Sequence, residues 1–280
     1  MNPLSPNQAL RCATDAARAA GALMRSNLRS AKKIHAATSH DIKLELDVRC
    51  QRTIERILSP AFPEAAILGE EGVAGKADAR YRWVVDPIDG TVNFAYGIPH
   101  ACVSIALQTR SAQRATRKGT KPKGGILDAT RTTQYATLVG VVYDPFLDEM
   151  WTAIRGGPAR LNSRVIHVSR RRNIADAIVS TGFAKTQAAL ERGLPYFSSL
   201  ARRARKIRIM GAAALALTYV ASGRFDAYVE RNVRLWDIAA GGLIIECAGG
   251  EFWYEPTAPN HTYRMIATNG LITDQLPRLV

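Results

Sequence analysis

The spacing of small and apolar residues near the N-terminus predicts a first helix. These residues recur three or four positions apart, the repeat of one helical face, at Leu10, Ala13, Ala17, Ala20 and Met24. The residues before them form a helix start: Ser5 can cap, Pro6 suits the first helical position and Gln8 completes a capping box. We expect a helix here with one buried face.

A second helix is predicted over residues 47–58. Its buried stripe would consist of Val48, Cys50, Ile54, Ile57 and Leu58. We expect the helix to end at Ser59-Pro60, because proline removes a helical hydrogen bond and clashes with the preceding turn.

Three strands are predicted over residues 82–85, 102–108 and 135–143. The first runs straight into Asp86-Pro87-Ile88-Asp89-Gly90-Thr91, which we interpret as a turn. After about residue 150, helical and strand-like segments alternate, including a helix of small residues over about 212–222. This alternation is typical of a layered α/β arrangement.

A basic segment separates the last two of these strands. Residues 109–134 carry seven Lys or Arg residues against one acid, and glycines and a proline interrupt them. Because this is far longer than an ordinary hairpin loop, we interpret it as a solvated insert, with a functional loop as the alternative. Two further basic clusters occupy residues 170–172 and 202–208.

Composition narrows the class of protein. The 280 residues are 47% hydrophobic, enough for a large core, and 38 Lys and Arg against 24 Asp and Glu give a net charge of +14. Such a charge attracts phosphates, nucleic acids or acidic membranes. The alternative is that it only keeps the protein surface solvated. The four cysteines are far apart, which predicts free thiols in a reducing compartment.

Two observations indicate a cytoplasmic protein without a membrane segment. The N-terminal stretch carries charges where the apolar core of a secretory signal would lie. The longest near-apolar run, residues 209–221, is shorter than the roughly 18 to 20 residues that cross a bilayer.

The segment from Asp86 to Thr91 carries the strongest chemical signal. Two carboxylates three residues apart and an intervening carbonyl can converge on one cavity, and such oxygen ligands suit Mg²⁺ rather than zinc. Gly90 lets the backbone approach a phosphate, and the N–H groups of a helix starting there would bind anions. An Asp-x-x-Asp sequence alone is also common in surface turns.

Two other acidic segments strengthen this interpretation. Glu70 and Glu71 follow an apolar run, and Asp237 lies at the start of a helix of small residues. Alone, Asp237 could be a simple helix cap. The three acidic segments together favour a metal site.

These segments resemble the signatures of the inositol monophosphatase family. The matching stretches are residues 69–71, 83–94 and 236–241, with further similarity at residues 140–145 and 223–230. The resemblance extends over about residues 8–255, and Val92-Asn93-Phe94 favours the inositol branch over sister phosphatases.

The resemblance implies a fold and partners. The fold would be a layered α-β-α-β-α sandwich of the sugar-phosphatase type, in which α+β and α/β architectures combine. Residues 1–150 would form an α+β half with most metal ligands, and residues 151–280 an α/β half with Asp237 and the substrate-facing residues. A homodimer and lithium sensitivity are also expected.

The resemblance also implies a role for each matching residue. Two or three Mg²⁺ ions would be held by Glu70, Asp86, the carbonyl of Ile88, Asp89 and Asp237. Catalysis would involve Asp47, Glu70 and Thr91. Contacts with the substrate would come from Asp89, Gly90, Thr91, Gly211, Ala212, Ala213 and Glu230. Leu44 and Ala212 replace hydroxyl residues that are common in the family.

The implied activity is hydrolysis of a small phosphomonoester, with myo-inositol monophosphate the leading substrate. The alternatives within the same chemistry are fructose 1,6-bisphosphate, histidinol phosphate and 3′-phosphoadenosine 5′-phosphate. An alternative of another class is a protein of this fold that binds RNA or the transcription machinery, which the basic insert motivates. Few aromatic residues lie among the arginines, which disfavours specific recognition of single-stranded nucleic acid.

Overall fold

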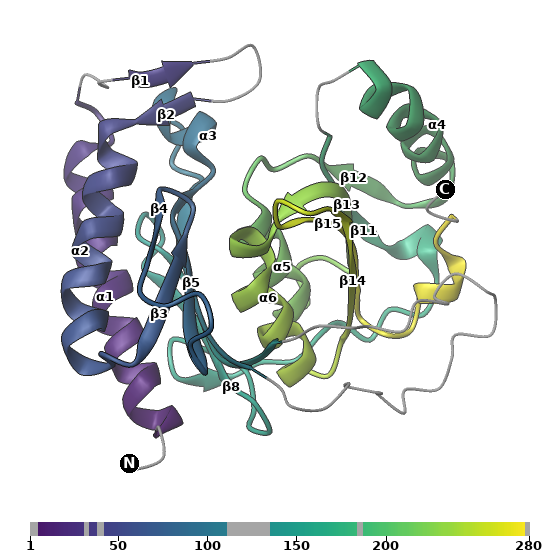
Figure 1. The fold of residues 1–280 in the computed structure, drawn as a ribbon. Helices are drawn as coiled ribbons and strands as arrows, with labels where there is room; N and C mark the ends of the chain where they lie inside the picture. The colour runs from purple at the N-terminus through teal and green to yellow at the C-terminus, as the bar shows by residue number, and fades with distance from the viewer. Residues whose placement is uncertain (1–4, 31–33, 38–41, 111–134, 184–186, 278–280) are drawn as a thin grey trace.

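The computed structural model describes residues 5–30, 34–37, 42–110, 135–183 and 187–277. These residues form five layers, helix, sheet, helix, sheet, helix (Figure 1). The helices are α1 (Pro6–Asn27), α2 (Glu45–Ala61), α3 (Thr91–Ala95), α4 (Gln187–Arg203), α5 (Ala213–Ala221) and α6 (Leu235–Cys247). Helices α1 and α2 form one outer layer, α5 and α6 the middle layer and α4 the other outer layer. The predicted layered sandwich is confirmed.

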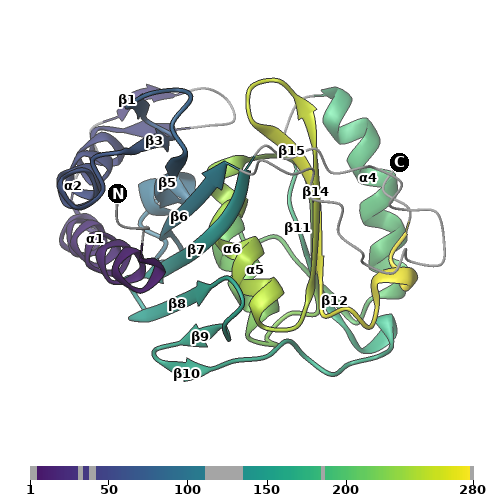
Figure 2. The same cartoon turned by 60° about the horizontal axis from the view of Figure 1, so that its bottom comes forward.

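The larger sheet has eight strands in the order β10-β9-β8-β7-β6-β5-β3-β4 (Figure 2). Its strands are β3 (Ala65–Gly69), β4 (Gly72–Ala74), β5 (Tyr81–Asp89), β6 (Cys102–Arg110), β7 (Tyr135–Asp144), β8 (Glu149–Ile154), β9 (Arg160–Leu161) and β10 (Arg164–Val165). All neighbours are antiparallel except β3 and β5, which run parallel. Strands β1 (Ile34–Ala37) and β2 (Ile42–Leu44) pair separately.

The second sheet has five strands in the order β12-β11-β13-β15-β14. They are β11 (Ile178–Thr181), β12 (Lys206–Arg208), β13 (Ala227–Arg234), β14 (Glu251–Ala258) and β15 (Thr262–Thr268). Strand β11 runs parallel to β12 and β13, whereas β15 is antiparallel to both neighbours. Two short 3-10 helices, Ile174–Asp176 and Thr273–Gln275, flank this sheet.

Helix α1 begins as its sequence predicts. Ser5 accepts a hydrogen bond from the Gln8 N–H, and Pro6 is the first helical residue. The buried face consists almost wholly of alanine, and Leu10 remains partly exposed. Small side chains let the helix lie close to β7: a side chain at Gly21 would collide with the Tyr143 ring.

The end of helix α2 differs from the prediction. The helix does not stop at Ser59-Pro60 but continues to Ala61, with Pro60 inside its last turn. The N–H of Phe62 then donates to the Leu58 carbonyl at 3.0 Å and closes this turn. Cys50, Ile54 and Leu58 of the predicted stripe are buried, whereas Val48 and Ile57 are partly exposed.

The predicted turn after residue 85 is wrong in its extent. Strand β5 continues through Asp89, and only Gly90 lies in a turn. The pairing with β6 shifts between Asp86 and Asp89, so Pro87 and Ile88 form an irregularity in the ladder. Proline fits there because it has no N–H to give to the ladder.

Helices α5 and α6 are apolar on nearly every side, which suits a layer enclosed between two sheets. Close contact with the larger sheet depends on Gly140 of β7, where an added Cβ would lie 2.8 Å from the Ala240 carbonyl oxygen.

Strand β6 extends to Arg110 and therefore includes the first two residues of the predicted basic insert. Residues 111–134 lie outside the described residues. None of the described helices combines the length and apolarity that a bilayer crossing demands.

Candidate active site

The end of strand β5 carries the first two aspartates of the candidate site. Asp86 lies opposite Ser104 and Asp89 opposite Cys102 on strand β6. Both aspartates are buried, with 2% and 8% of their surfaces exposed. The Ile88 N–H donates to Asp86 Oδ1 at 3.0 Å, so the irregularity in the strand itself orients this carboxylate.

Asp89 is held by the start of helix α5. The N–H of Ala213 donates to its Oδ1 at 3.1 Å, and the N–H of Ala214 to its Oδ2 at 2.7 Å. The Cys102 thiol lies 3.6 Å from the same Oδ2. Burial raises the pKa of Asp89 to about 6, although these hydrogen bonds act in the opposite direction. The predicted 211–213 segment therefore lies directly against the acid.

Asp47 and Asp237 occupy the same position in their helices. Each is the third helical residue, and each accepts a backbone hydrogen bond at 2.7 Å from the residue three positions earlier, Leu44 or Arg234. This contact fixes the carboxylate over the N-terminal turn, where the helix dipole favours negative charge. Asp237 is thus not the cap residue itself, which is Arg234.

Glu70 joins the group through parallel strand pairing. Strands β3 and β5 run in the same direction, and the Glu70 N–H donates to the Val85 carbonyl at 3.1 Å. Glu70, directly after β3, and Asp86, near the end of β5, therefore lie side by side. Ser104 helps bring in helix α6, since its hydroxyl donates to the Trp236 carbonyl at 3.0 Å.

The acids repel one another. Burial raises the pKa of Asp86 well above its usual range, and the charges of neighbouring acids raise it further; in decreasing order these are Glu70, Asp89, Asp237 and Asp47. Burial and the charges of Asp89, Glu70 and Glu230 likewise raise the pKa of Asp237. The structure thus brings together acids that are up to 190 positions apart in the sequence.

The chemistry of these donors fits a hard divalent cation. All are carboxylate or carbonyl oxygens, and a cation would relieve the repulsion that raises their pKa values. Among the described residues, no group of three or more His, Cys, Asp or Glu side chains is already arranged to enclose a metal ion.

Gly90 and Thr91 lie beside the two aspartates. Gly90 has φ 91°, and an added Cβ would lie 2.9 Å from the His100 carbonyl oxygen and 3.2 Å from the Ala212 Cβ. Only glycine suits this conformation and this close approach. The Thr91 hydroxyl donates to the Ile88 carbonyl at 2.8 Å, so it is oriented toward one of the expected metal ligands.

Asn93 is a positioning residue for which the sequence analysis assigned no role. Its amide donates to the carbonyls of His100 and Met210, each at 2.9 Å. It packs against Gly211, which has φ 73°, and so ties the β5–α3 segment to the start of α5. Its presence in the 83–94 motif is the sequence signal that could have indicated this role. Cys102, by contrast, becomes part of the site only through strand register.

Glu230 connects the acids with a cavity beyond strand β11. Its carboxylate accepts a hydrogen bond from the Tyr228 hydroxyl, and an added Cβ at Gly182 would collide with it. Burial raises the pKa of Glu230 to about 7, and the charge of Asp89 contributes in the same direction. The structure thus places Glu230 next to the acids, on the side of the cavity.

The raised pKa of Glu230 predicts a pH dependence of stability. Between its ordinary pKa of 4.5 and about 7, the folded state binds this proton more tightly than the unfolded chain. The resulting stabilisation is complete below pH 4.5 and is lost as pH rises through 7. From pH 5 to pH 8, Glu230→Gln should therefore gain up to about 3 kcal/mol in free energy of unfolding relative to wild type.

Urea denaturation in a chelating buffer at several pH values measures this difference. Glu64→Gln, at an exposed position, serves as the control and should keep a constant difference from wild type. A pH-independent difference for Glu230→Gln would contradict the assigned pKa shift.

Known proteins resemble this chain over most of its length. The model of the inositol monophosphatase family matches residues 5–114 and 132–273, so the middle of the basic segment falls outside the match. The chain is 35% identical over 254 residues to "Nus factor SuhB" of Pasteurella multocida, which covers 89% of this chain and 84% of that protein. It is 39% identical over 216 residues to "Inositol-1-monophosphatase" of Rhizobium meliloti, at 75% and 71% coverage.

A solved structure shares the whole fold. The extragenic suppressor protein suhB from Bartonella henselae superposes with a TM-score of 0.82 at 30% identity and covers 97% of both chains. These matches, together with the order of the acids along the chain, lead to one assignment. The chain belongs to the inositol monophosphatase family.

Proposed function

We propose that this protein is a Mg²⁺-dependent phosphatase that hydrolyses a small phosphomonoester, with myo-inositol monophosphate the leading substrate. The observation that carries the proposal is the group of mutually repelling carboxylates around the buried Asp86. A protein accepts this electrostatic cost where a function requires it. Membership of the family supports phosphatase chemistry for this group of acids.

The proposed metal ligands follow from the donor set. Glu70, Asp86 and the Ile88 carbonyl would hold one Mg²⁺, and Asp86, Asp89 and Asp237 a second, with a third, weaker ion near Glu70. Bound there, Mg²⁺ would neutralise the charge of the phosphate and lower the pKa of water.

The chain's own residues would orient the reactants. The Thr91 hydroxyl donates to the Ile88 carbonyl, which leaves its oxygen free to accept a hydrogen bond from a water molecule. Asp47, close enough to raise the pKa of Asp86, would assist in positioning that water. The N–H groups of Gly90 and Thr91 would bind the phosphate, so an in-line attack needs no covalent nucleophile.

The substrate's alcohol would lie on the side of helix α5 and strand β13. The segment Gly211 to Ala213 passes beside Gly90, and Glu230 faces the acids from the second sheet. Both lie next to the proposed phosphate position. We also propose that the protein is cytoplasmic, forms a homodimer and is sensitive to lithium.

A phosphate-release assay tests the proposal. The panel contains inositol 1-phosphate, fructose 1,6-bisphosphate, histidinol phosphate and 3′-phosphoadenosine 5′-phosphate, each with Mg²⁺ or with a chelator. We expect release from inositol 1-phosphate that disappears with the chelator. Preference for another substrate would keep the reaction and change the substrate, whereas no release from any of them would contradict the enzyme proposal.

A binding function is the second candidate, because close relatives carry the name Nus factor SuhB. Exposed arginines of the 170–172 and 202–208 clusters would contact the phosphates of RNA. Filter binding of RNA at increasing salt tests this candidate. We expect affinity that falls steeply with salt and weakens when Arg202 and Arg203 are both replaced by glutamine; affinity that neither change alters would contradict it.

A further inference from the structure

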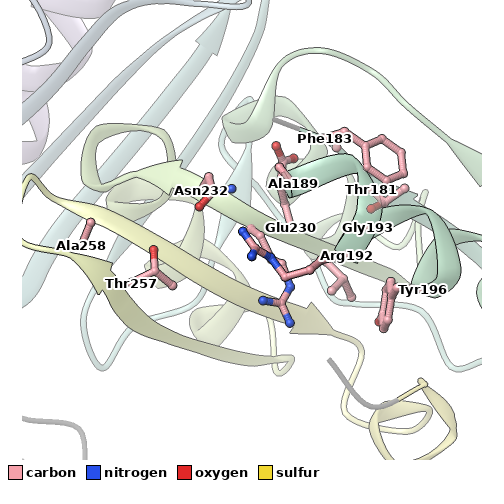
Figure 3. A pocket seen from close by; sticks show the side chains of 13 residues that line it. Thr181, Phe183, Ala189, Arg192, Gly193, Tyr196, Glu230, Asn232, Thr257 and Ala258 are labelled. Atoms are coloured by element: carbon pink, nitrogen blue, oxygen red, sulfur yellow. The ribbon is translucent and has the colours of Figure 1, made fainter. Parts of the chain in front are cut away.

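A cavity of about 230 Å³ opens where strand β11 ends (Figure 3). The pairing of β11 with β13 ends at Thr181 and Val229, and among the described residues no strand continues along this side of β13. Arg192 and Tyr196 of helix α4 line the cavity there. Successive residues of strand β13 face opposite sides of the sheet. Beyond the end of β11 the cavity extends to both sides of β13. Glu230, next to the acids, and Arg231, on the side of α4, therefore line the same space.

Two polar atoms at this cavity are buried without a hydrogen-bond partner among the described residues. They are Nη2 of Arg231 and the hydroxyl oxygen of Tyr196. Leaving such groups unsatisfied destabilises the folded state, most strongly for a charged group. Their positions at a cavity of this size, far larger than one water requires, point to a polar ligand.

The charges around the cavity indicate the sign of that ligand. Burial lowers the pKa of Arg231, and the positive charges of Arg264 and Arg192 lower it further. The nearby acid Glu255 forms an ion pair with Arg264. Arg192 is exposed on α4 at the rim of the cavity. An anion would relieve the repulsion among these guanidinium groups.

We propose that this cavity is an anion subsite in which Arg231, Arg192 and Tyr196 receive a second phosphate group of the substrate. A phosphomonoester that carries a second phosphate would then bind more tightly than its counterpart without that phosphate. The inference rests on the proposed function, because Glu230 joins the cavity to the acids that would bind the phosphate to be cleaved. Guanidinium groups suit this task because they bind phosphate through two parallel hydrogen bonds.

The test compares a matched pair of substrates, fructose 1,6-bisphosphate and fructose 1-phosphate, in Mg²⁺ buffer. Wild type should show a KM for the bisphosphate about tenfold or more below that for the monophosphate. Arg231→Met and Arg192→Met should each reduce this preference severalfold, without a change in kcat for the monophosphate. Arg52→Met, at an exposed position on α2, is the matched control and should keep the preference.

The outcomes separate the subsite from the proposed function. Hydrolysis of the monophosphate by the variants shows that the fold and the acids are intact; an unchanged preference in both arginine variants, or none in wild type, would overturn the subsite. If no phosphomonoester is hydrolysed, calorimetric titration with fructose 1,6-bisphosphate still tests whether the anion subsite exists. Binding to wild type that weakens about tenfold in Arg192→Met supports the subsite, and equal or absent binding overturns it. Arg192 is exposed, so this variant folds even if Arg231→Met does not.

Discussion

Replacing Asp86 by asparagine is expected to lower phosphate release by about a thousandfold and to stabilise the metal-free protein. Asparagine retains an oxygen that can accept from the Ile88 N–H, so the local geometry survives. The lost charge would weaken both proposed metal positions. The same charge is disfavoured by burial and by the neighbouring acids, which raise the pKa of Asp86.

The sign of the stability effect follows from that pKa. A carboxyl whose pKa is raised on folding destabilises the folded state as pH rises and the group ionises. In a chelating buffer, Asp86→Asn should therefore increase the free energy of unfolding more at pH 8 than at pH 5. Steady-state kinetics and urea denaturation measure the two effects, with Asp78→Asn, at an exposed position, as control. Less than a tenfold loss of activity would contradict the metal assignment; unchanged stability would contradict the electrostatic account.

Gly140→Ala is expected to lower the free energy of unfolding by about 3 kcal/mol. The new methyl group would lie 2.8 Å from the Ala240 carbonyl oxygen, a backbone atom of helix α6 that cannot simply rotate away. Strand β7 and helix α6 would have to separate. This contact joins the larger sheet to the middle helices, so the effect should spread to the candidate site.

Gly157→Ala provides the matched control for this prediction. An added Cβ there would meet only the Ile154 carbonyl oxygen, at 3.4 Å. Such a substitution is near neutral or slightly stabilising, since alanine reduces the freedom of the unfolded chain. Urea denaturation of both variants gives the comparison. Equal stability of the two would show that the β7–α6 contact has room for a methyl group.

Local patterns predicted the elements whose causes are local. Helix α1 begins where Ser5 and Pro6 predict, because a cap involves only neighbouring residues. Strand β7 also lies where its sequence predicts. The end of α2 and the length of β5 were predicted wrongly. Pro60 is tolerated because it lies in the last turn of α2. Pro87 is tolerated because it lies in an irregular part of the β5–β6 ladder, which depends on pairing with a distant strand.

The sequence by itself determined the order of the acids, because residue types at fixed spacings persist whatever surrounds them. Through the resemblance of these motifs to a known family, it also indicated the family and the layered fold. Only the tertiary structure decided which backbone N–H groups hold Asp89, how burial and repulsion raise the pKa values of the acids, and which two arginines line the cavity beside Glu230. Residues that come together from distant positions leave no periodic trace along the chain, since their contact depends on strand register and on how the layers pack.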